Sequence, residues 1–142
     1  TDFSAASDYY NGKETVKGSI IGKVNMTIRC DTVVGKSNSE FIPADGVILP
    51  VTEFEIEDGD TVYDLLVEAA RKFGIQVEND GTTDLAYISG INYLYEYQFG
   101  DLSGWVFHVN GTAVSVGCGE FALSDGDVIE WLYTCALGND LT

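Results

Sequence analysis

The stretch SGWVFHVNG, residues 103–111, contains the side chains whose types and spacing best suit contact with a ligand. Trp105 and Phe107 alternate with Val106 and His108, so in a strand both rings lie on one face. Aromatic rings combine a large apolar surface with polar edges, a combination that suits recognition. Core packing produces the same alternation. The pattern therefore predicts either a closing wall of the core or the wall of a binding site.

His108 and Cys118 are the two residues that a thiol enzyme would use as base and nucleophile. Such an enzyme needs a thiolate and a base that is held by an orienting group. His108 is the single histidine of the chain, and no third residue completes a catalytic constellation. We therefore predict that the protein is not an enzyme and has no catalytic residues.

Acidic residues concentrate at expected turns, and their oxygens raise the question of a calcium site: Asp58, Asp60, Asp101, Glu120, Asp125 and Asp127. Calcium requires about six to eight converging oxygen ligands, and the sequence lacks the spacing of an EF-hand loop. Asp beside Gly also forms tight turns without any metal. We therefore expect no metal site, and a calcium- or other metal-binding module remains an alternative.

One helix is expected among the elements that position the hairpin. Apolar residues recur at steps of three and four from residue 62 to residue 73 (Val62, Leu65, Leu66, Ala69, Phe73). Asp60 or Thr61 is suited to cap the first turn, and Gly74 is suited to the left-handed position that ends a helix.

Short strands account for most of the remaining chain. Residues 23–34 alternate between apolar and polar, and residues 46–57 are extended, with Pro50 restricted to an edge. Another strand is expected to carry Tyr93, Tyr95 and Tyr97 on one face. Asn110-Gly111 predicts a type I′ hairpin turn, and a further strand is expected over residues 112–117. One helix on a mixed, mostly antiparallel sheet is an α+β fold, and the order of elements is β-grasp-like.

Length and charge limit the organisation and the partners of the chain. Its 142 residues predict one domain, residues 19–142, after a flexible tether of residues 1–18. A formal charge of −16 excludes nucleic acid as a partner, and no apolar run is long enough for membrane insertion. The low lysine content and the Asn-x-Thr sequons at Asn25 and Asn110 favour an extracellular or cell-surface location.

The three cysteines leave several pairings open. Cys30, Cys118 and Cys135 contain no CxxC pair, so zinc ribbons and thioredoxin-type motifs are excluded. Cys30 meets Cys135 if the first and last strands are neighbours, whereas Cys118 with Cys135 closes a shorter loop. Buried, unpaired thiols are the third alternative.

The C-terminal half, GDLSGWVFHVNGTAVSVGCGEFALSDGDVIEWLYTCALGND, resembles a bacterial domain family of unknown function described as transcobalamin-like C-terminal. The resemblance extends back through IPADGVILPVTEFEIEDGDTVYDLLVEAARKFGI and YISGINYLYEY, and so covers roughly residues 24–140. It implies a β-grasp-like module similar to the small domain of intrinsic factor and transcobalamin, which closes over bound cobalamin. The larger helical domain of those carriers has no counterpart in this chain.

In the carriers an aromatic hairpin touches the ligand, and its place in this chain is SGWVFHVNG. The resemblance therefore implies a ligand-binding site formed by Tyr95, Ser103, Gly104, Trp105, Phe107 and Asn110. Relatives often have a cysteine at the position of Phe99 to pair with that of Cys118, so the resemblance implies the remaining bridge, Cys30 with Cys135.

These observations predict a secreted or cell-surface, non-enzymatic binding module without a resident cofactor. Its partner is expected to be a small ligand, such as a cobalamin-type corrinoid, or a surface protein. The alternative is a structural or protein-interaction domain of a surface assembly.

Overall fold

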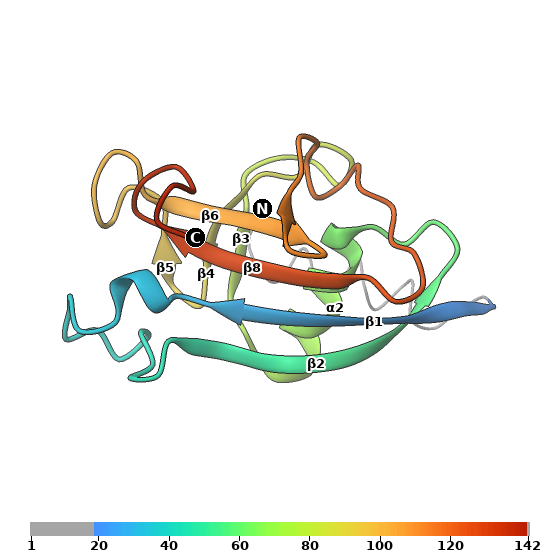
Figure 1. Ribbon diagram of the computed structural model, residues 1–142, viewed down its shortest axis with the longest axis horizontal. Helices are drawn as coiled ribbons and strands as arrows, with labels where there is room; N and C mark the ends of the chain where they lie inside the picture. Colours follow the sequence, from blue (N-terminus) through green and yellow to red (C-terminus); the bar gives the residue numbers. More distant parts are fainter. Residues whose placement is uncertain (1–18, 142) are drawn as a thin grey trace.

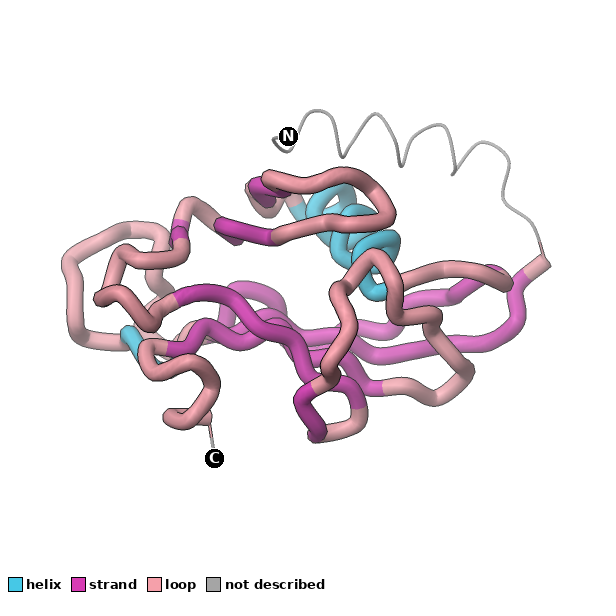
Figure 2. The backbone as a smooth tube through the Cα atoms, turned by 90° about the horizontal axis from the view of Figure 1, so that it is seen from above, coloured by secondary structure: helices cyan, strands magenta, loops and turns pink. Residues whose placement is uncertain are grey.

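The computed structural model describes residues 19–141, which form two layers (Figures 1 and 2). One layer is a five-stranded sheet in the order β2-β1-β8-β6-β7. The other contains the helix α2 and a three-stranded sheet in the order β3-β4-β5, on one face of the large sheet. The fold is therefore α+β, as predicted. The expected tether, residues 1–18, lies outside the described residues.

The large sheet is antiparallel except at its centre. Its strands are β1 (Ile20–Arg29), β2 (Val47–Glu57), β6 (Gly104–Val109), β7 (Thr112–Ala113) and β8 (Val128–Thr134). The first and last strands, β1 and β8, are parallel neighbours, with Asn25 opposite Val128 and Arg29 opposite Leu132. The covered face supplies much of the core, through Val24, Met26, Ile28, Phe54, Ile56, Ile129, Trp131 and Tyr133. Pro50 is exposed on β2, an edge strand, as predicted.

The helix α2 (Val62–Phe73) has the predicted bounds and caps. The Thr61 hydroxyl accepts a hydrogen bond from the Asp64 backbone N–H at 3.2 Å, and the Asp64 carboxylate accepts one from the Thr61 N–H at 2.9 Å. These two bonds form a capping box, which satisfies backbone donors that a helix start leaves free. Gly74 ends the helix at φ 66°. Among residues 19–141, no helix is long and apolar enough to cross a membrane.

The small sheet consists of β3 (Val77–Asn79), β4 (Ile88–Ile91) and β5 (Leu94–Tyr95). A tight turn at Asn92 and Tyr93, both at positive φ, joins β4 to β5. Tyr63 on α2 contacts this layer, because its hydroxyl accepts a hydrogen bond from Asn79 at 3.3 Å. The helix and the small sheet are therefore joined within the second layer, on the same face of the large sheet.

Three stretches differ from the expected strands. Strand β1 ends at Arg29, and the short 3-10 helix η1 (Asp31–Val33) follows where residues 23–34 were expected to stay extended. Strand β7 contains only two residues of the expected strand over 112–117. The strand expected over Tyr93, Tyr95 and Tyr97 is wrong, because Tyr93 and Tyr97 adopt positive φ in turns on either side of the two-residue β5. The three tyrosines therefore do not share one face of a strand.

Candidate functional site

Strand β6 presents the predicted aromatic side chains to the covered face of the large sheet. It pairs with β8 so that Trp105 lies opposite Tyr133 and Phe107 lies opposite Trp131. The rings of Trp105 and Tyr133 meet edge to face at 5.3 Å, and those of Phe107 and Trp131 are tilted at 5.3 Å. The expectation that Trp105 and Phe107 share a face is confirmed.

Trp105 is mainly a core residue, since only 9% of it is exposed. Its indole N–H donates a hydrogen bond to the Leu94 carbonyl oxygen at 2.8 Å, which satisfies the polar edge of the ring. The Tyr133 hydroxyl donates to the Tyr95 carbonyl oxygen, also at 2.8 Å. Both side chains thus connect the large sheet to β5, and only a small part of Trp105 reaches the surface.

Trp105 lines a groove of about 280 Å³ beside the start of β6, which we call the β6 groove. Its lining includes the residues at the start of β6 and the end of β8: Ser103, Gly104, Trp105, Val106 and Thr134. Four apolar side chains line it and remain well exposed: Tyr87 (52%), Tyr97 (64%), Leu102 (50%) and Leu137 (71%). Exposed apolar side chains gathered around a concave surface are typical of binding sites.

Two carboxylates, Glu96 and Asp101, also line the β6 groove. The Tyr87 hydroxyl donates a short hydrogen bond to Glu96. This bond to a carboxylate favours the protonated phenol, and it raises the pKa of Tyr87 to about 12. The groove therefore combines aromatic and aliphatic surfaces with negative charge.

A smaller hollow of about 140 Å³ adjoins the groove along Trp105 and Tyr87. Phe107, Trp131 and Cys118 line it. Burial raises the pKa of the Cys118 thiol to about 12, so this sulfur stays protonated and is a poor nucleophile near neutral pH.

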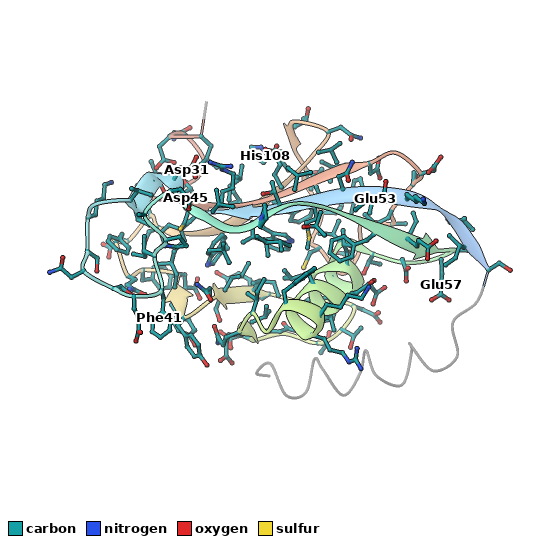
Figure 3. All side chains as sticks on the ribbon, turned by 90° about the horizontal axis from the view of Figure 1, so that it is seen from below. Asp31, Phe41, Asp45, Glu53, Glu57 and His108 are labelled. Atoms are coloured by element: carbon teal, nitrogen blue, oxygen red, sulfur yellow. The ribbon has the colours of Figure 1, made fainter. Side chains whose placement is uncertain are left out.

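His108 lies on the other side of the large sheet from this hollow. It alternates with Phe107 along β6 and has Glu130 and Ala113 as its strand neighbours. Figure 3 shows His108 on the side of the sheet away from α2. The sheet thus separates His108 from Cys118, and the two side chains cannot act together as base and nucleophile.

The structure brings together only part of the predicted site. Ser103, Gly104 and Trp105 line the β6 groove, and Phe107 shares the adjoining hollow with Trp105. Ser103 is buried, and its hydroxyl donates to the Gly100 carbonyl oxygen at 2.7 Å. Tyr95 and Asn110 line neither hollow.

Tyr95 and Asn110 instead serve local structure. The Tyr95 hydroxyl accepts a hydrogen bond from the Gln76 side chain at 2.8 Å. Asn110 is in the predicted tight turn before Gly111, with positive φ at both residues, and its side chain bonds to Asp127 and to the Val128 N–H. It stands at the opposite end of β6 from the groove.

Eight groove residues were not part of the predicted site: Tyr87, Glu96, Tyr97, Asp101, Leu102, Val106, Thr134 and Leu137. Most of them lie in turns or loops, where no hydrophobic period predicts the direction of a side chain. One feature of the sequence could have pointed to the groove. Tyr97 and Leu102 are apolar residues on either side of Gly100, in a segment that forms no strand.

The turn carboxylates accept hydrogen bonds from nearby backbone groups. Asp60 accepts from the Glu57 N–H at 2.8 Å, and Asp125 accepts from the Lys23 N–H at 2.9 Å. Within residues 19–141, no group of three or more His, Cys, Asp or Glu side chains is arranged to hold a metal ion.

Another groove of about 280 Å³ lies by the C-terminal end of β8, lined by Arg29, Asp31, Glu130 and Asp140 among others. Its charges are largely satisfied from within the chain. Arg29 pairs with Asp31 at 3.1 Å, and Asp140 accepts hydrogen bonds from Thr134 and from the Cys135 N–H. It contains no residue of the predicted site, so the β6 groove is the stronger candidate.

All three cysteines are free thiols in the structure, so the expected bridge between Cys30 and Cys135 is not formed. The parallel register pairs Arg29 with Leu132, which offsets Cys135 from Cys30 by two residues along the strands. Cys30 follows the end of β1 and Cys135 follows the end of β8, so the ladder does not place the two residues opposite each other.

Residues 59–134, from just before α2 to the end of β8, match a family described as "Domain of unknown function (DUF4430)". The chain belongs to this family. The DUF4430 match thus includes α2, β6 and all lining residues of the β6 groove except Leu137. None of the curated proteins compared matches this DUF4430 chain.

Solved structures with a similar fold include haptocorrin in complex with Cbi, with a TM-score of 0.54 and 17% sequence identity. The alignment covers 84% of this DUF4430 chain but only 27% of the haptocorrin chain. A second is a protein from Ruminococcus gnavus ATCC 29149 described as a "putative metal binding protein", with a TM-score of 0.48 and 14% identity over 80% of this chain and 96% of that one. The haptocorrin likeness shows a shared fold.

Proposed function

We propose that this DUF4430 domain is a non-enzymatic binding module, secreted or on a cell surface, that takes a small ligand in the β6 groove. The carrying observation is the groove itself, in which four exposed apolar side chains and Trp105 line one concave surface. Burying such side chains against a ligand releases water from apolar surface, which favours binding.

A β-grasp-like, transcobalamin-like assignment of the fold accompanies this proposal. The parallel pairing of the first strand with the last, at the centre of the sheet, supports it. The fold shared with haptocorrin supports it as well. On this assignment a corrinoid is the leading ligand, and the groove is the counterpart of the hairpin surface that contacts it.

The size of the groove limits how much of a ligand the domain can enclose alone. A volume of about 280 Å³ is just below the range of sites that enclose a drug-sized molecule. A corrinoid is larger, so only one of its edges would enter the groove. A second domain or protein would then cover the remaining surface of the ligand.

Non-enzymatic action is supported by the positions of the two reactive side chains. The Cys118 thiol has a raised pKa, and His108 lies on the opposite face of the sheet. Neither side chain has the arrangement that nucleophilic catalysis needs.

A structural or protein-interaction domain is the second candidate function, favoured by the same exposed side chains. Tyr97, Leu102 and Leu137 together form an apolar patch of the kind that docks onto a protein. This function becomes the better explanation if small molecules leave the groove untouched.

Titration with cobalamin, followed through NMR chemical shifts of the backbone amides of residues 96–106, tests the proposal. We expect shifts confined to the groove and the Trp105 indole N–H, and weaker binding by Leu102→Ser. Val51→Ser on β2 is the matched control, because Val51 is also exposed but lies outside the groove. The small-ligand function is wrong if neither cobalamin nor a chemically diverse set of small molecules at millimolar concentration shifts these amides.

A further inference from the structure

The half of the chain that forms the β6 groove is depleted of positive charge. Between Phe73 and Thr142 the sequence contains ten Asp or Glu residues but no Lys or Arg. Every residue that lines the groove belongs to this stretch, and among the described lining residues none is Lys, Arg or His. A ligand approaching the groove therefore meets a negatively charged surface, which attracts cations and repels anions.

The two carboxylates of the groove can still accept hydrogen bonds from a ligand. Within residues 19–141, neither Glu96 nor Asp101 forms an ion pair with a basic side chain. Glu96 accepts the Tyr87 hydroxyl through Oε1, which fixes the carboxylate beside the ring. An ionised carboxylate offers about four acceptor positions, so Glu96 can accept further hydrogen bonds from a ligand.

The apolar side chains of the groove indicate what kind of cation fits it. Tyr87, Tyr97 and Trp105 place aromatic rings around the groove, and Leu102 and Leu137 supply aliphatic surface. Aromatic rings attract cations through their quadrupole, most strongly when the site is partly desolvated. A strongly hydrated metal ion would gain little from these five side chains, whereas an organic cation would gain from all of them.

We propose that the β6 groove selects a small organic cation, an ammonium or guanidinium group carried on an apolar body, through Glu96, Asp101 and the rings of Tyr87 and Tyr97. This assignment rests on the proposed function, because it names the chemical class of the group that enters the same groove. It holds whether that group is the whole ligand or one part of a larger molecule.

Choline and its uncharged isostere 3,3-dimethylbutan-1-ol distinguish charge from shape. Each is titrated at low salt while the amide shifts of residues 96–106 and the Trp105 indole N–H shift are recorded. We expect choline to bind in the millimolar range and the isostere at least about ten-fold more weakly. Equal binding of both in the groove overturns the cation assignment and leaves the proposed function intact. If neither choline nor the isostere shifts the groove, the cation assignment also fails, and the cobalamin titration decides the proposed function separately.

Two neutral variants, Glu96→Gln and Asp101→Asn, test the carboxylates. Both keep the shape of the side chain, and Glu96→Gln retains an oxygen that accepts the Tyr87 hydroxyl. We expect each to weaken choline binding about three- to ten-fold without altering binding of the isostere.

Glu55→Gln is the matched control, because it removes the same charge from an exposed position on β2 outside the groove. We expect it to leave choline binding within about two-fold, because the Coulomb interaction weakens with distance and Glu55 lies outside the groove. A loss with Glu55→Gln as large as that with Glu96→Gln overturns the assignment, since only the overall charge would then matter. Thermal unfolding confirms that each variant is folded.

Discussion

The indole N–H of Trp105 in the large sheet donates a hydrogen bond to the Leu94 carbonyl oxygen in the small sheet at 2.8 Å. The bond connects the two layers. Trp105 therefore belongs to the core, and only a small part of it is open to a ligand.

Trp105→Ala should destabilise the domain by about 3–5 kcal/mol, because it leaves a cavity in the core and removes the hydrogen bond from the indole N–H to the Leu94 carbonyl oxygen. Urea unfolding followed by circular dichroism measures this loss. Tyr97→Ala, which changes an exposed ring beside the same groove, should alter the free energy of unfolding by no more than about 1 kcal/mol. Similar losses for both variants would show that Trp105 is not a core residue.

Gly90→Ala should also destabilise the fold, because an added Cβ would lie 2.4 Å from the ring of Tyr95. Such overpacking costs about 1–3 kcal/mol. The cost should fall in a Tyr95→Ala background, where the space is free, and a double-mutant cycle measures the coupling. An uncoupled pair would mean that Tyr95 does not pack on Gly90 and is available for another role.

The hydrogen bond between Tyr87 and Glu96 predicts a dependence on alkaline pH. The pKa of Tyr87 in the folded state is raised to about 12, above the ordinary value near 10 expected in the unfolded chain. The folded state therefore holds the proton more tightly. Its contribution to stability is complete below pH about 10 and is lost as the pH rises through about 12.

NMR titration of isotope-labelled tyrosine resolves the Tyr87 ring and measures this pKa directly. Glu96→Gln should lower the pKa of Tyr87, since the carboxylate that favours the protonated phenol is removed. Tyr87→Phe, which should abolish the signal, is the control for assignment. A Tyr87 pKa that is unchanged in Glu96→Gln would contradict the hydrogen bond.

The three cysteines should differ sharply in their reaction with iodoacetamide. Burial raises the pKa of Cys30 to about 11 and that of Cys118 to about 12, so both thiols should react slowly in the folded protein. Cys135 is only half-buried and should be alkylated first. Mass spectrometry without a reducing agent should find one added group on the folded protein and three after denaturation. Fewer than three groups after denaturation would indicate a disulfide.

The elements with local chemical signals could be predicted from the sequence. Thr61 and Gly74 mark the ends of α2 because a hydroxyl caps a helix start and glycine tolerates positive φ. Asn110-Gly111 predicts its turn for the same reason. The face shared by Trp105 and Phe107 follows from the two-residue period of a strand.

The groove could not be predicted in this way, because it depends on turns without a local signal. Tyr97 and Leu137 adopt positive φ although neither is glycine, asparagine or aspartate, and the surrounding fold imposes these conformations. Alternating tyrosines also suggested a strand where the chain turns twice. The offset of Cys135 from Cys30 likewise depends on the register of β1 and β8, which no spacing in the sequence specifies.

The parallel pairing of β1 with β8 has a mechanical consequence. Ile20 begins one strand and Thr134 ends the other, so these two residues lie toward opposite ends of the pair (Figure 1). Tension applied between them pulls the strands past each other and loads all hydrogen bonds of the ladder at once, instead of opening them one by one. The domain should therefore resist stretching along this direction far better than peeling from the β2 edge.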